Sequence, residues 1–344
     1  MPAEVFTSPQ RLVFPAAQSV TLEPFDPGPP GPGQVRVRTQ LSMMSTGTEN
    51  IVFNRAFDPG THWDQWVKYP FHPGYIAVGT VEAAGPDVAD PAVGQRVAFR
   101  RPHASHTVLP AAECYPVPEG LPTERALWFA LAKIAYHGAL AARYRLGDEA
   151  LVIGAGPVGQ MSVRWARAAG AAFVGVLDQT ADRLEAARRG GATFATTTPL
   201  AEAADTLRAA NDGRLPRVVI DSTGNAAVFA AALGLAADGG TVVVLGDTGR
   251  PAQQALTSDV IRRGLHVVGA HDAHNTPEWN NATASRLFFR LAGSGQFPLG
   301  GLTSHVFAPE DCAAAYALAN RDRTATMGIL FDWAGGFVPE EGGA

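Results

Sequence analysis

Short stretches of alternating apolar and polar residues fill the first third of the chain. They cover residues 34–38, 77–82, 95–99 and 106–109, with glycine- and proline-containing pairs between them. Such alternation is typical of antiparallel strands that bury one face, and the glycine and proline pairs mark turns. The pattern therefore predicts an all-β unit over residues 1–122.

A different pattern begins at residue 123. Compact apolar runs, each a few residues long, alternate with longer stretches of helical periodicity. Nearly continuous apolar strands between helices are typical of a parallel sheet that helices cover on both faces. Residues 123–144 are expected to form the leading helix, with Thr123 as its N-cap, in a doubly wound domain over residues 123–271. The apolar runs are residues 150–153, 173–177, 218–220, 241–245 and 266–268.

Residues 272–344 contain one helical stretch near 311–319 and one apolar strand near 328–331. Because that is too little to bury a separate core, we expect these residues to pack onto the β unit. The predicted fold is α/β, with a β domain of residues 1–122 and 272–344 beside the doubly wound domain. The Gly- and Glu-rich tail from residue 335 is expected to be poorly ordered.

Composition narrows the class of protein. The 344 residues are 46% hydrophobic and 17% charged with a net charge of -5, which suits globular domains and provides no basic patch for nucleic acid. The chain has no run of about 18 apolar residues, and residues 1–5 lack the basic and apolar segments of a signal peptide. We therefore expect a cytoplasmic protein that binds neither nucleic acid nor membrane.

Two residue types are rare. Cys114 and Cys312 lie far apart and outside any Cys-x-x-Cys or Cys/His cluster, which excludes a disulfide framework and a cysteine-based zinc site. Lysine occurs only as Lys68 and Lys133, against 25 arginines. Lys133 lies in an otherwise apolar helical stretch, so a specific role is expected for it.

The strongest motif is a glycine-rich turn directly after the first apolar run. Gly154, Gly156 and Gly159 give the spacing G-x-G-x-x-G, with Pro157 and Val158 opening the following helix. The first glycine permits a tight turn, the second lets the backbone approach a pyrophosphate, and the third lets helix and strand pack closely. The N–H groups and dipole of the helix would then favour the phosphates of a dinucleotide.

Asp178 ends the next apolar run, 19 residues after Gly159, and no basic residue occupies positions 179–182. A carboxylate there accepts hydrogen bonds from ribose hydroxyls and repels a 2′-phosphate, so we expect NAD(H) rather than NADP(H). The turns after the apolar runs 218–220 and 241–245 also lie at the carboxyl ends of predicted strands, where doubly wound sheets bind ligands. They add the candidate cofactor-binding residues Thr223, Gly246 and Asp247, with ordinary turns as the alternative.

Residues 41–49, residues 73–82 and the Gly154 turn resemble the medium-chain dehydrogenase/reductase superfamily, and the resemblance covers nearly the whole chain. It implies a GroES-like catalytic domain, a Rossmann-fold dinucleotide-binding domain and an active site between them. Residues 45–49 with 73–75 look most like the zinc-lacking branch that includes bacteriochlorophyllide a dehydrogenase.

Comparison with the zinc-dependent members of this superfamily indicates that the zinc ligands are missing from this chain. Zinc-dependent members carry Cys-Gly-Thr-Asp and Gly-His-Glu in the first two segments, whereas this chain has Thr46 at the Cys, Tyr75 at the His and Ile76 at the Glu. The third ligand position aligns with Ala130. Because such side chains cannot hold tetrahedral zinc, no metal site is expected.

The activity implied by the resemblance is a zinc-independent, NAD(H)-dependent interconversion of a secondary alcohol and a ketone. Without zinc, another group must stabilise the alkoxide and exchange its proton. We expect Tyr75 to do so, assisted by the charge of Lys133 and the hydroxyl of Thr48. Glu49 matches the acid that supports the metal ligands in relatives. The structural alternative is that Tyr75 only fills the vacated metal cavity.

The substrate is expected to be a small-molecule alcohol or ketone. Residues 54–71 carry more polar and aromatic groups than a flat chlorin pocket needs, which favours a polyol, a cyclitol or a sugar-like alcohol, or a larger hydroxylated molecule. The alternative for this stretch is a Trp-anchored surface loop. His72 and His271 are also alternative proton donors. The candidate substrate residues are Thr46, His62, Trp63, Trp66, His72 and His271.

Two other functions stay open. A zinc-free quinone or enone reductase would deliver hydride to an activated double bond, but such enzymes often use NADPH, which Asp178 disfavours. A non-catalytic NAD-binding protein would have the same fold. Members of the superfamily associate as dimers or tetramers, so we expect a homodimer or a homotetramer.

Overall fold

The computed structural model describes residues 8–339. Residues 1–5, on which the prediction about a signal peptide rests, and the end of the tail from residue 340 lie outside this part. The described chain forms two compact units. The first contains the residues up to Ala130, Ser285–Gly293 and those from Gly300 onward, and the second contains Leu131–Ala284 and Ser294–Leu299.

The bounds of these units differ from those of the expected domains. Residues 123–130 cluster with the first unit, and residues 272–284 cluster with the second. The division into domains at 122/123 and 271/272 stays a prediction. Within residues 8–339, no helix combines the length and the apolar character needed to cross a bilayer.

The first unit is built on a seven-stranded sheet in which all neighbouring strands are antiparallel except β14 and β15. The two strands from the end of the chain extend this sheet, as expected for the C-terminal segment. Residues 272–284 and 294–299 of that segment cluster instead with the second unit. The strand order is β14 (Thr303–Phe307), β15 (Gly328–Asp332), β3 (Gln34–Met43), β4 (Ala77–Ala84), β5 (Arg96–Phe99) and β7 (Tyr115–Pro116), with β6 (His106–Pro110) paired to β3.

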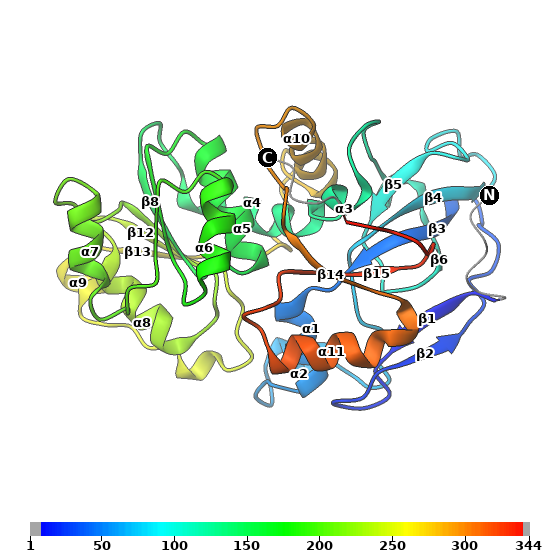
Figure 1. The fold of residues 1–344 in the computed structure, drawn as a ribbon, viewed down its shortest axis with the longest axis horizontal. Helices are drawn as coiled ribbons and strands as arrows, with labels where there is room; N and C mark the ends of the chain where they lie inside the picture. Colours follow the sequence, from blue (N-terminus) through cyan, green and yellow to red (C-terminus); the bar gives the residue numbers. More distant parts are fainter. Residues whose placement is uncertain (1–7, 340–344) are drawn as a thin grey trace. The chain divides into compact units, whose positions relative to one another are not determined.

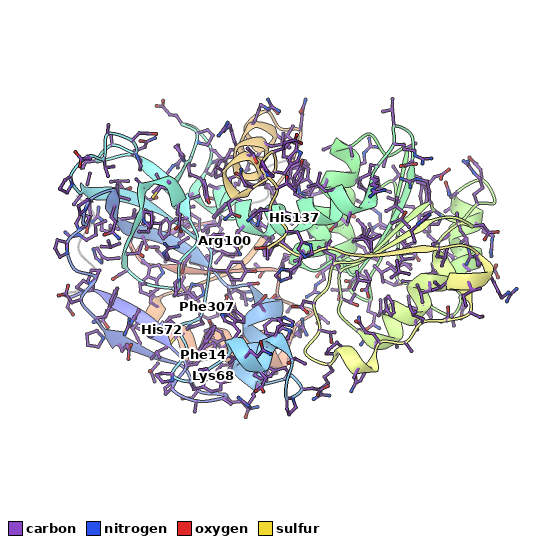
Figure 2. All side chains as sticks on the ribbon, turned by 180° about the vertical axis from the view of Figure 1, so that it is seen from behind. Phe14, Lys68, His72, Arg100, His137 and Phe307 are labelled. Carbon is purple, nitrogen blue, oxygen red and sulfur yellow. The ribbon has the colours of Figure 1, made fainter. Side chains whose placement is uncertain are left out.

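Helices and a hairpin cover one core of the first unit. The hairpin is β1 (Gln10–Val13) with β2 (Thr21–Pro24). Phe14, labelled in Figure 2, and Tyr316 are buried in this core and meet edge to face, with ring centroids 5.0 Å apart. The helices of this unit are α1 (Thr46–Asn54), α2 (His62–Trp66), α3 (Thr123–Ala126) and α11 (Cys312–Arg321), with short 3-10 turns at η1 (Ala111–Glu113) and η3 (Pro309–Asp311).

The single helix expected over residues 123–144 is two helices, α3 and α4 (Phe129–Ala142). The N-cap of α3 is Pro122, so the prediction that Thr123 caps this helix is wrong. Thr123 is the first helical residue, and its hydroxyl accepts a hydrogen bond from the Arg96 guanidinium at 3.2 Å. The threonine therefore ties the helix to β5 and does not cap its backbone.

The second unit is the doubly wound domain that the sequence predicts. Its six strands are all parallel and follow the order β10-β9-β8-β11-β12-β13, so the order reverses between β8 and β11. Ligands bind such sheets beyond the carboxyl ends of the strands at that reversal. The strands are β8 (Glu149–Ile153), β9 (Phe173–Leu177), β10 (Phe194–Thr196), β11 (Val218–Asp221), β12 (Thr241–Val244) and β13 (His266–Gly269).

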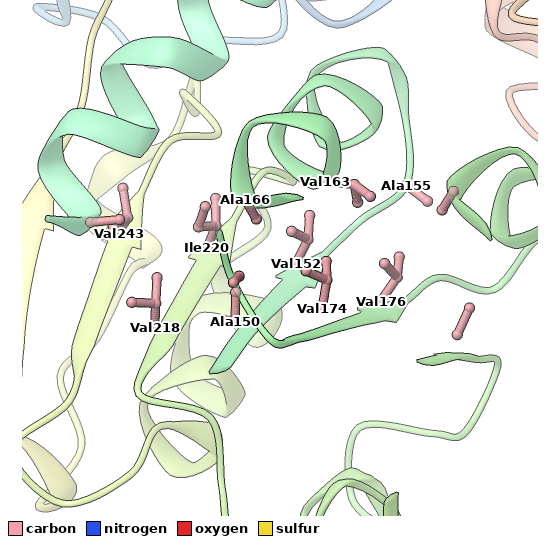
Figure 3. Packing of buried hydrophobic residues seen from close by; sticks show 14 of the residues in the cluster. Ala150, Val152, Ala155, Val163, Ala166, Val174, Val176, Val218, Ile220 and Val243 are labelled. Atoms are coloured by element: carbon pink, nitrogen blue, oxygen red, sulfur yellow. The ribbon is translucent and has the colours of Figure 1, made fainter. Parts of the chain in front are cut away.

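Helices cover both faces of this sheet (Figure 1). Side chains of α4, α5 and α6 pack with Val152, Val174 and Ile220 on one face, and Figure 3 shows part of this cluster. Side chains of α7 and α8 pack on the other face. The remaining elements are α5 (Pro157–Ala168), α6 (Ala181–Arg189), α7 (Ala203–Ala210), α8 (Ala226–Leu235), α9 (Asp259–Arg262), the turn η2 (Pro251–Gln253) and α10 (Asn281–Gly293), which continues into the first unit.

Candidate functional site

Loops after β8 and β11 meet at the carboxyl edge of the parallel sheet. Gly154 has a φ of +89°, and a Cβ there would lie 2.7 Å from Cγ2 of Thr223. The hydroxyl of Ser222 donates to the carbonyl oxygens of Ile153 at 3.0 Å and Gly154 at 2.9 Å. The structure thus brings the glycine-rich turn and Thr223 together at the point where the strand order reverses.

The three glycines of this turn have different surroundings. A Cβ on Gly159 would lie 1.8 Å from the Gly154 carbonyl oxygen, so only glycine permits this approach of α5 to β8. A Cβ on Gly156 would come no closer than 3.8 Å to another group, the Arg183 guanidinium. Gly156 therefore leaves open the space beside the first N–H groups of α5, which Pro157 begins. This is the cradle that a dinucleotide pyrophosphate requires, so the residues fit that group.

Asp178 lies beside the same turn. Its carboxylate accepts hydrogen bonds from the backbone N–H of Ala155 at 2.7 Å and of Thr180 at 2.8 Å. The guanidinium of Arg183 lies 4.0 Å from the same carboxylate. Arg183 lies five positions after Asp178, beyond positions 179–182, and the first turn of α6 returns its side chain to this carboxylate.

The turn after β11 is organised by a buried acid. One carboxylate oxygen of Asp221 accepts from the backbone N–H of Thr223 at 2.8 Å and from its hydroxyl at 2.7 Å. The other oxygen is buried and has no hydrogen-bond partner among residues 8–339. Burial raises the pKa of Asp221, while the hydrogen bonds from Thr223 act in the opposite direction. Asp221 therefore fixes the position of Thr223 at the sheet edge.

Gly246 has a structural role in addition to the cofactor binding expected for it. A Cβ there would lie 2.3 Å from the backbone nitrogen of Gly224 and 2.6 Å from the carbonyl carbon of Ser222. The glycine is needed because the turns after β11 and β12 pack backbone to backbone. The next residue, Asp247, is exposed. That Gly246 and Asp247 bind the cofactor stays a prediction.

In the first unit, Tyr75 and the start of α1 form a second polar group. The hydroxyl of Tyr75 lies 2.7 Å from the Ser45 hydroxyl, and Ser45 occupies the N-cap of α1. The Ser45 N–H donates to the Glu49 carboxylate at 2.7 Å, which satisfies a backbone donor ahead of the helix. Thr46 is buried and Thr48 half-buried in the first turn of α1.

Glu49 is the centre of a buried network. Its side chain is only 2% exposed, and its second oxygen accepts from the hydroxyl of Tyr316 and lies 3.2 Å from Nε2 of His103. Nδ1 of His103 lies 2.8 Å from the hydroxyl of Ser42. Burial, followed by the Glu49 carboxylate, raises the pKa of Tyr316 well above its ordinary value, so Tyr316 stays a hydrogen-bond donor.

The structure gives Tyr75 and Lys133 separate charged neighbours. The guanidinium of Arg100, labelled in Figure 2, lies over the Tyr75 ring at 4.9 Å from its centroid. Lys133 is buried in the second unit and donates to the carbonyl oxygen and, at 3.3 Å, to the carboxylate of Asp272. The assistance of Tyr75 by Lys133 and Thr48 therefore stays a prediction.

Lys133 belongs to a cluster of titratable side chains, around His137, that no sequence motif predicted. His137, labelled in Figure 2, is 5% exposed on the same helix. Burial and the Lys133 ammonium lower the pKa of His137 to about 4, against an opposing effect of Asp272; His274 and His271 lower it further. His137 is thus a neutral imidazole beside a buried ion pair at neutral pH.

The predicted substrate residues have varied surroundings. Trp63 is buried in the core of the first unit, whereas Trp66 is 52% exposed and its ring meets that of Trp63 at 5.7 Å. His62 is exposed next to them. His72 lies 3.5 Å from the Glu23 carboxylate, and exposed His271 accepts from the backbone N–H of Ala273 at 3.1 Å. Their contact with a substrate stays a prediction, as does that of Thr46.

The positions that hold zinc in relatives carry no metal-binding set. Ile76 and Ala130 are fully buried apolar residues, and Tyr75 is engaged with Ser45. Across the described residues, no three His, Cys, Asp or Glu side chains converge in a way that would hold a metal ion. The donor set at these positions does not fit tetrahedral zinc.

An antiparallel β unit followed by a doubly wound domain with a glycine-rich dinucleotide turn defines the class of two-domain nucleotide-binding oxidoreductases. Two family models agree with it: residues 31–156 match the alcohol dehydrogenase GroES-like domain, and residues 157–286 match the zinc-binding dehydrogenase model. The chain belongs to the medium-chain dehydrogenase/reductase superfamily.

Individual relatives are distant. A D-guloside 3-dehydrogenase of Escherichia coli (strain K12) is 27% identical over 252 residues, which is 68% of this chain and 72% of that protein. An L-threonine 3-dehydrogenase of Anaeromyxobacter sp. (strain K) is 28% identical over 83% of this chain and 88% of its own length.

Solved structures share the fold over nearly the full length. An alcohol dehydrogenase from E. coli CFT073 in complex with NADH has a TM-score of 0.78 at 20% identity and covers 94% of this chain and 99% of its own. A dehydrogenase from Sinorhizobium meliloti 1021 bound to NADP has a TM-score of 0.79 at 19% identity and covers 95% and 100%.

The close approach at Gly159 predicts a specific cost of adding one methyl group. Gly159→Ala is expected to lower the free energy of unfolding by about 1–3 kcal/mol, because its Cβ would overlap the Gly154 carbonyl. Gly234→Ala, in an open position of α8, is the matched control and is expected to stabilise the protein slightly. Urea denaturation measures both. Equal stability of the two variants would contradict this account of the turn.

The neutral state of His137 predicts how stability depends on pH. Its pKa is about 4 in the folded protein against 6.5 unfolded, so between these values the unfolded chain binds more protons and stability falls as pH falls. His137→Gln is expected to flatten this part of the profile of melting temperature against pH. His266→Gln, at an exposed position, is the matched control. An unchanged slope in His137→Gln would refute the assignment.

Proposed function

We propose that this protein is a zinc-independent, NAD(H)-dependent oxidoreductase of the zinc-lacking branch that interconverts a secondary alcohol and a ketone. Membership of the superfamily makes it an oxidoreductase of the alcohol dehydrogenase type. The observation that carries the finer proposal is the open cradle at Gly156 beside the Asp178 carboxylate. A nicotinamide dinucleotide bound there would supply the acceptor or donor of a hydride.

Asp178 supports NAD(H) over NADP(H). Its carboxylate is fixed by the backbone N–H groups of Ala155 and Thr180, so it cannot easily turn away from a ribose bound at the turn. A 2′-phosphate would be brought next to this negative charge. Arg183 offsets part of the repulsion at 4.0 Å. Because fold relatives carry NADH in one case and NADP in another, the choice rests on this pair of residues.

The residues at the positions of the zinc ligands support independence from zinc. Thr46, Tyr75, Ile76 and Ala130 offer no thiolate, imidazole or carboxylate donor. In its place Tyr75 would exchange the proton of the alcohol, with Lys133 and Thr48 assisting and Glu49 holding the start of α1. A phenol has an ordinary pKa of about 10, so a nearby positive charge is required for it to act as a base.

The substrate class follows from the relatives and from the polar side chains of the first unit. The D-guloside 3-dehydrogenase is named for oxidation of a sugar derivative, and the threonine dehydrogenase for oxidation of a secondary alcohol. We propose a polyol, a cyclitol or a sugar-like alcohol as substrate, with a larger hydroxylated molecule as the broader case. A homodimer or homotetramer and a cytoplasmic location also remain predictions.

A panel assay tests the function. The purified protein, dialysed against a chelator and analysed for zinc, is mixed with NAD⁺ and polyols, cyclitols, glycosides or secondary alcohols, and absorbance at the NADH wavelength is followed. We expect oxidation of at least one sugar-like alcohol by protein with far less than one zinc per chain. Loss of activity on chelation with recovery on adding zinc would reject zinc independence. Activity only on enones or quinones would favour a reductase, and no activity a non-catalytic protein.

The choice of dinucleotide has its own test. Asp178→Ala is expected to weaken the preference for NAD(H) over NADP(H) by about 1–3 kcal/mol, because it removes charge-assisted hydrogen bonds to the ribose and a repulsion toward phosphate. Isothermal titration calorimetry of both dinucleotides measures the difference. Asp182→Ala, an exposed acid on α6, is the matched control. Tighter binding of NADP(H) by the unaltered protein would overturn the assignment.

A further inference from the structure

The polar group around Tyr75 contains two residues for which the motifs predicted no individual role. Ser45 places its hydroxyl 2.7 Å from that of Tyr75, and Arg100 places its guanidinium over the ring. Both belong to the same compact unit as Tyr75. A hydroxyl partner fixes the direction of the phenol O–H, and a positive charge within about 6 Å of the ring favours negative charge on the tyrosine.

A buried carboxylate, that of Glu49, holds Ser45 in place. The Ser45 N–H donates to Glu49, whose carboxylate also accepts from Tyr316 and contacts His103. These three side chains are buried, so the carboxylate has little freedom to move. The hydrogen bond to Glu49 therefore fixes the backbone of Ser45 and with it the position of the Ser45 hydroxyl. The Tyr75 hydroxyl, which hydrogen-bonds to the Ser45 hydroxyl, is oriented by it.

We infer that Ser45 and Arg100, beyond the residues named in the proposed function, position and polarise Tyr75 for proton exchange with the substrate oxygen. This inference rests on the proposed function. A bound nicotinamide dinucleotide would accept the hydride of the carbinol carbon. In alcohol oxidation the Tyr75 phenolate would accept the hydroxyl proton, which leaves a ketone and a neutral Tyr75. Tyr75 then releases the proton to solvent, and ketone reduction reverses each transfer. Ser45 and Arg100 are positioning residues because they act through Tyr75.

The charged groups described around Tyr75 are Arg100 over its ring and, through Ser45, the carboxylate of Glu49. The two have opposite effects on a phenolate, and the guanidinium is in direct contact with the ring. Arg100 is therefore the cation of this unit whose removal should alter Tyr75.

Phenolate absorbance in the protein without dinucleotide gives a readout independent of activity. Burial raises the pKa of four of the six tyrosines, so they titrate later: Tyr69, Tyr136 (about 12), Tyr144 and Tyr316. The difference between the unaltered protein and Tyr75→Phe isolates the titration of Tyr75. Arg100→Gln is expected to move this titration up by about one pH unit, and Arg100→Lys to restore most of the shift.

Kinetics supply the second readout. Ser45→Ala is expected to lower kcat about tenfold with little change in the KM for NAD⁺, and Arg100→Gln to shift the pH profile of kcat upward by the amount seen in absorbance. In a Tyr75→Phe background neither change should cause further loss, because both residues act through the missing hydroxyl. Arg101→Gln, at a neighbouring arginine paired with Glu113 at 2.8 Å, is the matched control.

The outcomes separate the inference from the proposed function. An unchanged Tyr75 titration in Arg100→Gln, or full additivity with Tyr75→Phe, overturns the inference even if the enzyme is active. A shifted titration in a protein that oxidises no alcohol rejects the proposed function, and with it the proton exchange. A shifted titration together with non-additive kinetics supports both.

Discussion

The absence of a side chain at Gly159 is the constraint on which the ligand edge of the parallel sheet depends. Helix α5 reaches β8 so closely there that the Gly154 carbonyl occupies the space of a Cβ. Only at this separation does the first turn of α5 lie beside the ends of β9 and β11. Asp178 and Ser222 then hydrogen-bond to the same turn. The loops after β8, β9 and β11 are thus hydrogen-bonded to one another, and a shift of α5 would disturb all three.

The first unit achieves similar precision by a different physical means. Its polar centre is a chain of side-chain hydrogen bonds in the interior. Because the Trp333 indole N–H can only donate, it donates to Ser42, whose own hydrogen is then available for His103. That leaves Nε2 of His103 to donate to Glu49. A buried network with every member satisfied favours one arrangement over others, at the start of the helix that carries Thr46 and Thr48.

Local sequence patterns were sufficient to predict the parallel sheet and its glycine-rich turn, because strand burial and turn geometry depend on residues close together in the chain. The partners of Glu49 could not be predicted in this way, since Tyr316 is 267 residues from it. The apolar sequence around Lys133 indicated a specific role for it, but its partner Asp272 is 139 residues distant. Thr123 failed as a cap because its hydroxyl has a competing tertiary partner in Arg96.

The burial of Lys133 also limits how the surface charge of the protein can be changed. With this residue enclosed, Lys68 beside α2 is the one exposed lysine among residues 8–339. The remaining basic side chains are those of arginine and histidine, and neither is a primary amine. Acylation, ubiquitin attachment and labelling at a side-chain amine all require an accessible lysine. Among residues 8–339, any such modification would therefore fall on Lys68 in the first unit.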